Sequence, residues 1–309
     1  MSLAPWQLEH FNRALQSFDE GRLGHAQLLI GAQGMGPLET ALAIGKRLLC
    51  TVAQGIALPC GACRSCTLLA AGTHPDLHVI TMTENEKTHT MRTGIVVEQL
   101  RDLGEDLQLS AQLGGPIVAI IHPAEAMNDN ASNALLKSLE EPLDNRYVFL
   151  VTSEPSRISA TIRSRCQRME FRMPSHAEGL YWLQFQGIDA KVAQDALLAA
   201  RGNPGLAMQW IQDDETLALR SQVRADLNDL QKGSNTVRKV SDRWQDHDRL
   251  DAILEFAADY ALEQARDEPE RARALGDWFD RANKTRADLR TTLRKDLMIF
   301  ELLARWKAI

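Results

Sequence analysis

Hydrophobic residues in the first half of the chain fall into short continuous runs, separated by stretches in which they recur at helical spacing. The runs lie at residues 26–30, 76–80, 117–121 and 147–152. The stretches of helical spacing lie at residues 38–49, 94–109 and 128–141. Short apolar runs of this kind are typical of strands that are buried on both faces. The pattern therefore predicts a mainly parallel sheet that is covered by helices on both sides.

The second half of the chain shows a different pattern, because the strand-like runs end at about residue 170 and helical spacing continues to the C-terminus. We therefore predict an α/β domain at residues 1–167, a small helical unit at 168–205 and a helical domain at 206–309. The last predicted helix has five apolar side chains at near-helical spacing, namely Leu289, Leu293, Leu297, Phe300 and Ala304.

Composition and charge narrow the classes of protein that fit this pattern. The 309 residues are 44% hydrophobic and contain no apolar run long enough to span a bilayer, and the N-terminus lacks a signal-peptide profile. The formal net charge of −6 argues against a protein that holds nucleic acid by its own electrostatic attraction. Five cysteines give no even disulfide framework. These features predict a cytoplasmic globular protein without a membrane segment.

A glycine-rich segment, GAQGMGPL, joins the first strand to the first helix of this pattern, as a phosphate-binding loop does. In the working pattern G-x-x-x-x-G-K-[ST], the lysine reaches the phosphates and the hydroxyl holds magnesium. Here Pro37 and Leu38 replace those two residues, and proline also lacks a backbone N–H donor. Gly31, Gly34 and Gly36 are therefore predicted to form a tight turn that no longer serves ATP chemistry.

A second part of a nucleotide site is also missing. The strand at residues 117–121 should end in an acidic pair that holds the metal and polarises water, but His122 and Pro123 follow it. Two independent losses in one site predict that the chain does not hydrolyse ATP.

Four cysteines lie within a short segment, in the pattern Cys50-x9-Cys60-x2-Cys63-x2-Cys66. Four thiolates suit a structural zinc ion with no open position for catalysis. An iron–sulfur cluster is the alternative, but the ferredoxin pattern needs a cysteine where Ala70 stands. With four thiolates present, we expect His74 to be a hydrogen-bonded residue and not a ligand.

Arginines cluster after the run at 147–152, at Arg157, Arg163, Arg165 and Arg168. One interpretation is a solvated basic turn. The other is that one arginine reaches a phosphate on a neighbouring subunit, as arginine fingers do. Their position alone leaves both interpretations open.

Two stretches, SNALLKSLEEP and FLVTSEPSRISATIRSRCQ, resemble the AAA+ subunits of bacterial DNA polymerase III clamp loaders. The four-cysteine segment after the glycine loop is similar to theirs, and CGACRSCTLLAAGTHPDLHVI matches the delta-prime subunits closely. The missing lysine and acidic pair separate the chain from the ATP-hydrolysing gamma/tau subunit. The resemblance is dense over about residues 1–210 and rests on helical pattern and position beyond them.

The resemblance implies an α/β RecA-like AAA+ domain, with a parallel sheet and helices on both faces, followed by a small helical lid and an all-α collar domain for oligomerisation. It makes residues 31–38 a degenerate Walker A loop, and His122 and Pro123 stand in for the Walker B acids. Ser153 takes the first sensor position. Gly205 takes the position of the second sensor arginine, which is a third loss in the same site.

The same resemblance implies zinc-ligand roles for the four cysteines of residues 50–66, and it assigns the finger position to Arg165 within Ser164-Arg165-Cys166. The implied protein is a non-hydrolysing stator in a ring of five with gamma/tau and delta subunits. It would support ATP-dependent loading of the sliding clamp onto primed DNA. It would be a subunit of the DNA-directed DNA polymerase III holoenzyme without ATPase or polymerase activity of its own.

Two rival interpretations belong to other classes of protein. An active gamma-like motor ATPase is opposed by five residues, namely Pro37, Leu38, His122, Pro123 and Gly205. A stand-alone zinc protein that binds nucleic acid is opposed by the acidic balance and by the lack of interleaved basic and aromatic residues. Retained ATP binding without hydrolysis stays open.

Overall fold

The computed structural model describes residues 3–55, 57–85, 90–92, 94–289 and 294–309. The chain divides into two compact units, Met1–Gln209 and Trp210–Ile309. No helix within the described ranges combines the length and the apolarity needed to cross a bilayer. The three-part division at residues 167 and 205 stays a prediction.

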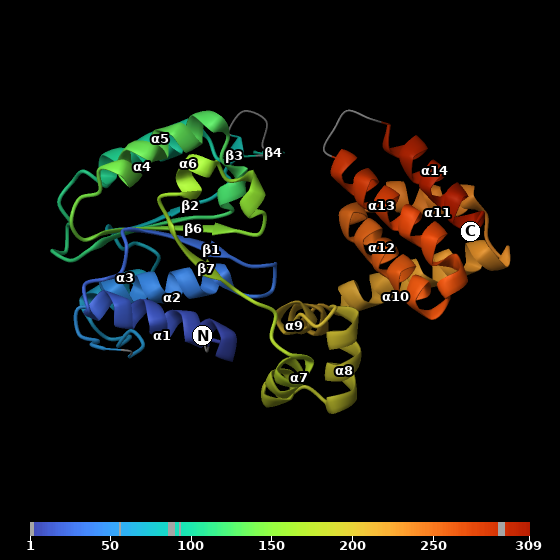
Figure 1. Ribbon diagram of the computed structural model, residues 1–309, viewed down its shortest axis with the longest axis horizontal. Helices are drawn as coiled ribbons and strands as arrows, with labels where there is room; N and C mark the ends of the chain where they lie inside the picture. Colours follow the sequence, from blue (N-terminus) through green and yellow to red (C-terminus); the bar gives the residue numbers. More distant parts are fainter. Residues whose placement is uncertain (1–2, 56, 86–89, 93, 290–293) are drawn as a thin grey trace. The chain divides into compact units, whose positions relative to one another are not determined.

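The first unit is built around a five-stranded parallel sheet with strand order β2-β5-β6-β1-β7 (Figure 1). The strands are β1 (Ala26–Ile30), β2 (Leu77–Ile80), β5 (Ile117–Ile121), β6 (Arg146–Thr152) and β7 (Gln167–Glu170). A separate antiparallel pair is formed by β3 (Glu84–Asn85) and β4 (Thr90–Met91). The predicted parallel sheet is confirmed, with β1, β2, β5 and β6 at the four apolar runs.

Helices cover both faces of this sheet (Figure 1). On one face lie α1 (Pro5–Asp19), α2 (Pro37–Leu49) and α3 (Arg64–Ala70). On the other lie α4 (Val97–Asp106), α5 (Asp129–Glu140) and α6 (Ala160–Arg163), and short 3-10 turns occur at η1 (Ala124–Ala126) and η2 (Pro155–Arg157).

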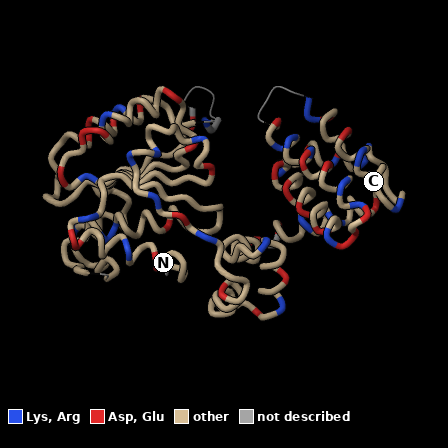
Figure 2. The backbone as a smooth tube through the Cα atoms, viewed as in Figure 1, with Lys and Arg blue, Asp and Glu red and all other residues tan. Residues whose placement is uncertain are grey.

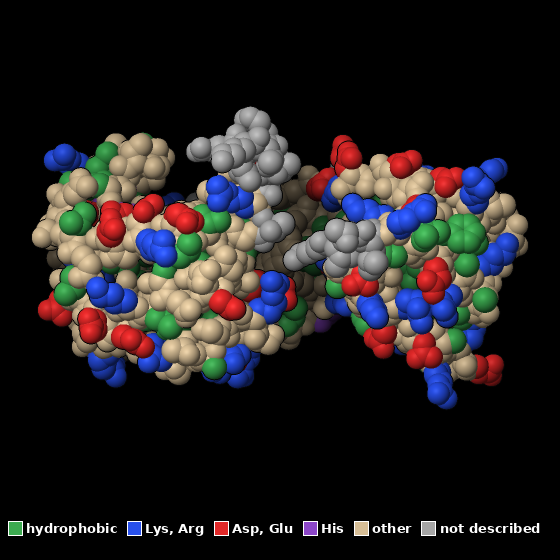
Figure 3. All heavy atoms as spheres, turned by 90° about the horizontal axis from the view of Figure 1, so that it is seen from above, with side chains coloured by type: hydrophobic (Ala, Val, Ile, Leu, Met, Phe, Trp, Pro, Cys, Tyr) green, Lys and Arg blue, Asp and Glu red, His purple; other side chains and the backbone are tan. Residues whose placement is uncertain are grey.

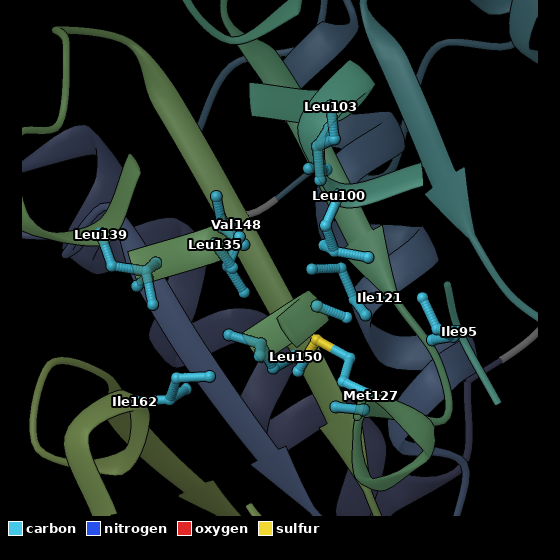
Figure 4. Close-up of a cluster of buried hydrophobic side chains, with 14 of the residues drawn as sticks. Ile95, Leu100, Leu103, Ile121, Met127, Leu135, Leu139, Val148, Leu150 and Ile162 are labelled. Atoms are coloured by element: carbon cyan, nitrogen blue, oxygen red, sulfur yellow. The ribbon is translucent and has the colours of Figure 1, made fainter. Parts of the chain in front are cut away.

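Alternate residues of the central strands pack into two separate cores. Ile117, Ala119 and Ile121 of β5 join the buried cluster beneath α4 and α5 (Figure 4). Val118 and Ile120 of the same strand join the cluster beneath α1 and α2. Because successive side chains point to opposite faces and both faces are dry, every position of β5 is apolar. This explains the continuous hydrophobic run in the sequence.

Three further helices form the lid, at α7 (His176–Phe185), α8 (Ala190–Ala199) and α9 (Pro204–Gln212), and the first unit ends within α9 at Gln209. Ser175 begins α7 with a capping box, in which its hydroxyl accepts from the N–H of Glu178 at 3.3 Å and the Glu178 carboxylate accepts from the N–H of Ser175 at 2.8 Å. Trp182 of α7 meets Trp6 of α1 edge to face, with ring centroids 5.2 Å apart. The lid therefore packs directly against the first helix of the chain.

In the second unit, the described residues form helices joined by short connecting segments, without a strand, as predicted for this part of the chain. They are α10 (Asp214–Lys232), α11 (Val237–Gln245), α12 (Leu250–Asp267), η3 (Pro269–Arg271), α13 (Ala272–Asp288) and α14 (Lys295–Lys307). Buried tryptophans help to fix their packing, because indole N–H groups among them find acceptors in the core. Trp306 donates to the carbonyl of Leu227 and Trp278 to that of Leu302, both at 2.9 Å. The predicted fold class, a RecA-like AAA+ domain with a helical lid and an all-α C-terminal part, is confirmed.

The apolar face predicted for the last helix is wrong. Leu289 follows the end of α13, α14 begins at Lys295, and Leu293 lies outside the described residues. Leu297 and Phe300 are 58% and 45% exposed. The buried residues of α14 are Ile299, Leu302, Leu303 and Trp306. The prediction assumed one uninterrupted helix, whereas two helices meet the core with different faces.

Charged side chains are mixed along both units. Figure 2 shows Lys and Arg interspersed with Asp and Glu along the helices of each unit. The face drawn in Figure 3 likewise carries both signs, with no large area of one charge. This distribution agrees with the acidic net charge in giving the chain no dominant basic surface on that face.

Candidate functional site

The glycine-rich loop lies at the carboxyl end of β1 and leads into α2. Its first N–H, that of Gly31, donates to the carbonyl of Thr152 at the end of β6 at 3.1 Å. Gly34 and Gly36 have φ values of 85° and 76°, a left-handed conformation that glycine adopts without steric penalty. Pro37 is the first residue of α2, where a helix needs no N–H donor of its own. The backbone turn is therefore kept, while Pro37 supplies neither a charge nor an N–H group.

Side chains from α1 and the lid bind the carbonyl groups of this loop. The pairs are Trp6 Nε1 to Met35 O at 3.0 Å, Gln7 Nε2 to Gly36 O at 3.3 Å, and Asn203 Nδ2 to Gln33 O at 2.7 Å. A Cβ placed on Gly36 would lie 1.5 Å from Gln7 Nε2, so the Gln7 amide rests directly against the loop. Three donors from distant parts of the first unit thus hold the loop in one conformation.

The start of α9 touches the same loop backbone to backbone. A Cβ on Gly205 would lie 1.7 Å from the carbonyl oxygen of Gly34, and a Cβ on Gly34 would lie 2.5 Å from the nitrogen of Leu206. Because the obstructing atoms belong to the backbone, no rotamer change relieves these contacts. An arginine at position 205, as the second sensor requires, fits only if the lid moves away from the loop.

The carboxyl end of β5, a strand that β6 separates from β1 in the sheet, carries no carboxylate at His122 or Pro123. The next acid along the chain, Glu125, instead accepts hydrogen bonds from the N–H and hydroxyl of Ser153 at 3.2 and 2.9 Å. Burial alone would raise the pKa of Glu125, but hydrogen bonds from its surroundings, including the hydroxyls of Thr152 and Ser153, lower it. Sequence reasoning missed Glu125, although it is the first acid after the apolar run. Ser153, to which the resemblance assigns the first sensor position, is therefore already paired with Glu125 within the chain.

The four cysteines of the inserted segment come together in space. Cys50 caps the end of α2, Cys63 caps the start of α3, and Cys66 lies in the first turn of α3. Their sulfur atoms and that of Cys60 all lie within 4.8 Å of one another, the one such cluster of potential ligands among the described residues. Backbone N–H groups point at three of these sulfurs, among them Cys63 N to Cys60 Sγ at 3.3 Å and Cys66 N to Cys63 Sγ at 3.4 Å.

The electrostatics of the cluster differ from sulfur to sulfur. The backbone hydrogen bond from Cys66 lowers the pKa of the Cys63 thiol to about 5. Burial raises the pKa of Cys66 to about 12. A metal ion binds thiolates, so Cys63 is prepared for binding and Cys66 must lose its proton. With this geometry and donor set, the cluster could hold a metal ion such as zinc, and its four protein ligands would leave no open position.

Buried hydrogen bonds through Ser65 and His74 join the cysteine segment to the rest of the first unit. The Ser65 hydroxyl donates to the carbonyl of Leu49 at 2.6 Å and lies 2.7 Å from His74 Nε2. The N–H of Asp76 donates to His74 Nδ1 at 3.1 Å, so the proton of the neutral ring sits on Nε2 and is donated to Ser65. His74 is 6% exposed, and burial lowers its pKa. The expectation that His74 is hydrogen-bonded is confirmed, while the identity of the metal ligands stays a prediction.

The arginines after β6 have separate surroundings. Arg165 follows α6 and forms an ion pair with Glu140 at the end of α5, with Nη2 2.8 Å from Oε1. Arg163 donates to the carbonyl of Pro155 at 3.0 Å, and Arg157 pairs with Glu154 at 3.3 Å. Arg168 lies exposed on β7. The side chain of Arg165 is 35% exposed, and its role as a finger stays a prediction.

Comparisons with known proteins agree with this arrangement. A family model described as "DNA polymerase III, delta subunit" matches residues 6–175. DNA polymerase III subunit delta' of Pseudomonas aeruginosa is 38% identical over 261 residues, which are 84% of this chain and 76% of the relative. The corresponding protein of Escherichia coli is 36% identical over 225 residues, 72% of this chain and 64% of the relative. This chain therefore spans slightly less than two thirds of the length of the Escherichia coli relative.

Two solved structures from Thermotoga maritima are more distant. A DNA polymerase III gamma subunit-related protein is 17% identical, with a TM-score of 0.45 and coverage of 98% of this chain and 99% of its own. A RuvB mutant is 18% identical, with a TM-score of 0.41 and coverage of 68% and 61%.

The family model covers more than half of the 309 residues, and the Pseudomonas aeruginosa relative exceeds 30% identity over most of both chains. The resemblance seen in the motifs is thereby confirmed, and the chain belongs to the DNA polymerase III delta-prime subunit family.

Proposed function

We propose that this chain is the non-hydrolysing stator subunit of a DNA polymerase III clamp loader. It takes one place in a hetero-oligomeric ring of five in the cytoplasm, together with gamma/tau and delta subunits, and supports ATP-dependent loading of the sliding clamp onto primed DNA. It leaves its own nucleotide site unused and gives Arg165 to the ATP site of a neighbouring subunit. Family membership supports this proposal, and so does the closed phosphate loop. By a closed loop we mean that Trp6, Gln7 and Asn203 bind the loop carbonyls and that the lid backbone lies against the loop.

The single observation that carries the proposal is that the chain's own side chains close its phosphate loop. A triphosphate that entered this loop would gain no lysine, no hydroxyl ligand for magnesium and no acidic pair after β5. If it displaced the loop, it would also break three side-chain hydrogen bonds to loop carbonyls, each worth about 1 kcal/mol. Binding of a triphosphate would therefore break these hydrogen bonds and form few new contacts with the phosphates.

The closed loop also suits a rigid subunit. Here the lid is held to the loop by the Asn203 hydrogen bond at 2.7 Å and by the contact between Gly34 and Gly205. A lid fixed in this way gives the other subunits a body against which they move.

Arg165 supports the second half of the proposal through its chemistry and exposure. Its guanidinium is planar, permanently charged and forked, so it can stabilise charge on a phosphoryl group across a subunit boundary. The side chain lies at the surface of the first unit and is 35% exposed.

We propose in addition that the four cysteines hold one structural zinc ion. Zinc with four protein ligands supplies folding energy and no catalysis. Its ligands come from the end of α2, the start of α3 and the segment between them. The ion would tie that segment to the sheet-covering helix α2.

The test of the proposed function is ATP binding and hydrolysis by the isolated chain, measured by calorimetric titration and by phosphate release. We expect neither above background. Turnover that a Gly36→Val substitution in this loop abolishes would contradict the proposal and favour the motor ATPase. Turnover that the same substitution leaves unchanged would come from a contaminant.

A further inference from the structure

We propose that Glu140 is the positioning residue for Arg165, which it holds in the orientation that reaches a phosphate of the neighbouring subunit. This inference rests on the proposed role of Arg165. It begins with the ion pair between Arg165 Nη2 and Glu140 Oε1, which are 2.8 Å apart. Glu140 is the last residue of α5, whereas Arg165 follows α6, so the contact joins two different elements.

The location of Glu140 indicates that its charge does not serve its own helix. The C-terminal end of a helix carries partial negative charge, and a carboxylate there is unfavourable. Glu140 stands at that end and is followed by Glu141. The Glu140 carboxylate is instead stabilised by its ion pair with the Arg165 guanidinium, which lies in the turn after α6.

The contacts of Arg165 fix its guanidinium without using all of its donors. Nη1 donates to the carbonyl of Thr161 at 3.0 Å and to the hydroxyl of Ser164 at 3.3 Å, while Nη2 binds Glu140. A guanidinium has five N–H donors in a fixed plane. These three contacts leave two N–H donors for phosphate oxygens. The orientation of the guanidinium plane is determined by Glu140 on one side and by Thr161 and Ser164 on the other.

Holding a side chain before its partner arrives lowers the entropy cost of the productive contact. A free arginine side chain has a large rotamer entropy. Thr161 and Ser164 contact Arg165 only from its own turn, whereas Glu140 contacts it from a different helix. The carboxylate also draws some positive charge away from the phosphate. We assign the larger effect to orientation, because two N–H donors of the Arg165 guanidinium remain for the phosphate.

The pair is suited to mutational analysis because it contributes little to folding. The side chains of Arg165 and Glu140 are 35% and 48% exposed, and exposed ion pairs add little stability. Glu141 offers a matched control, because it is an exposed glutamate at the same helix end, and the described residues include no ion-pair partner for it. Glu140→Ala and Glu141→Ala remove the same charge one residue apart.

The experiment is a double-mutant cycle on ATP hydrolysis by the reconstituted clamp loader, stimulated by clamp and primed DNA. The variants are Glu140→Ala, Glu140→Gln, Arg165→Ala, the double variant Glu140→Ala with Arg165→Ala, and the control Glu141→Ala. Thermal unfolding of each isolated chain is measured alongside. At the ATP site that faces Arg165, we expect Glu140→Ala to lower kcat by about threefold to tenfold with little change in KM, since coupled pairs commonly interact on this scale.

We expect the Gln variant to lose less, because its amide oxygen still accepts from Nη2, and the control to match the unaltered chain. In the Arg165→Ala background, Glu140→Ala should have no further effect, because a positioning residue has nothing left to position. Equal losses in the presence and absence of Arg165, unchanged hydrolysis, or faster hydrolysis after Glu140→Ala would each overturn the proposal. If Arg165→Ala itself had no effect, the proposed function of Arg165 would fail as well, which distinguishes the two claims.

Discussion

Single residues decide what the nucleotide-binding end of the first unit can do. Pro37 keeps the start of α2 but removes the charge and the N–H that a phosphate needs. Gly205 has a less obvious effect, because its lack of a side chain lets the lid backbone rest on Gly34. The residue to which the resemblance assigns the second sensor position thus also permits the lid to lie against the loop.

Restoring an arginine at position 205 should therefore damage the fold instead of repairing an ATP site. We expect Gly205→Arg to lower the free energy of unfolding by about 1–3 kcal/mol, as overpacking does, and to expose residues 200–209 to protease. Chemical denaturation and limited proteolysis measure these effects. Gly276→Arg is the control, since a Cβ there meets open space inside α13, and helix propensity favours the change. Equal stability of the two variants would count against a closed lid.

At the scale of elements, the inserted cysteine segment behaves as a local module. All four sulfurs come from residues 50–66, and Ser65 and His74 join the module to the carbonyl of Leu49 at the end of α2. None of these four cysteines belongs to either hydrophobic cluster of the sheet. Metal loss should therefore affect the module more than the domain.

Protein purified without chelator should contain one zinc per chain by elemental analysis. After chelation, hydrogen exchange should accelerate in residues 50–70, while the strands of the sheet keep their protection, because the ligands are local. Protection in β5 serves as the internal control. Iron with inorganic sulfide, or intact thiols without any metal, would contradict this prediction.

Zinc affinity should rise with pH. The Cys63 thiol, with a pKa of about 5, is already a thiolate at neutral pH and releases no proton on binding, whereas Cys66, with a pKa of about 12, releases one. Zinc binding at about pH 7 should therefore release fewer than four protons per ion. Calorimetry in buffers of different ionisation enthalpy measures this number. Release of all four protons, or an affinity independent of pH, would be inconsistent with these thiol states.

The sequence predicted elements well where one strong local pattern determined them. The apolar run at β5 is one such pattern, because burial on both faces makes every residue of the strand apolar. The spacing of the four cysteines is another, because they lie within residues 50–66 and come together in space. Strand β7 was missed because only Met169 of its four residues is buried. The loop closure was not predictable, since the bond from Asn203 to Gln33 joins residues 170 positions apart and an amide side chain does not indicate its acceptor.

At the scale of the whole molecule, the two units have independent cores and separate tasks in the proposed account. The first carries the closed loop and Arg165, and the second packs its helices around buried tryptophans. A ring subunit that does not hydrolyse ATP still needs its shape and its contacts with neighbours. We attribute much of that assembly to the second unit.

Removal of residues 210–309 should leave a folded first unit that no longer joins the ring. The reason is that Met1–Gln209 keeps both hydrophobic clusters of the sheet, while the helices proposed for oligomerisation are lost. Circular dichroism checks folding, and size-exclusion chromatography with gamma/tau and delta subunits checks assembly. A truncated chain that entered the complex normally would show that the first unit suffices for assembly.

The most direct measurement of the central claim is ATP hydrolysis by the reconstituted complex that carries Arg165→Ala, with clamp and primed DNA present. Loss of such fingers costs about 10³-fold or more at the affected site in related chemistry, and the bulk decrease is smaller because the other sites of the ring continue. We predict that hydrolysis and clamp loading fall with Arg165→Ala. Arg165→Lys should retain them only in part, because an ammonium lacks the forked donors of a guanidinium. Arg168→Ala should have little effect, because Arg168 is an exposed residue on β7. Unchanged hydrolysis with Arg165→Ala, or an equal fall with Arg168→Ala, would contradict the claim that this chain serves the ATP site of its neighbour.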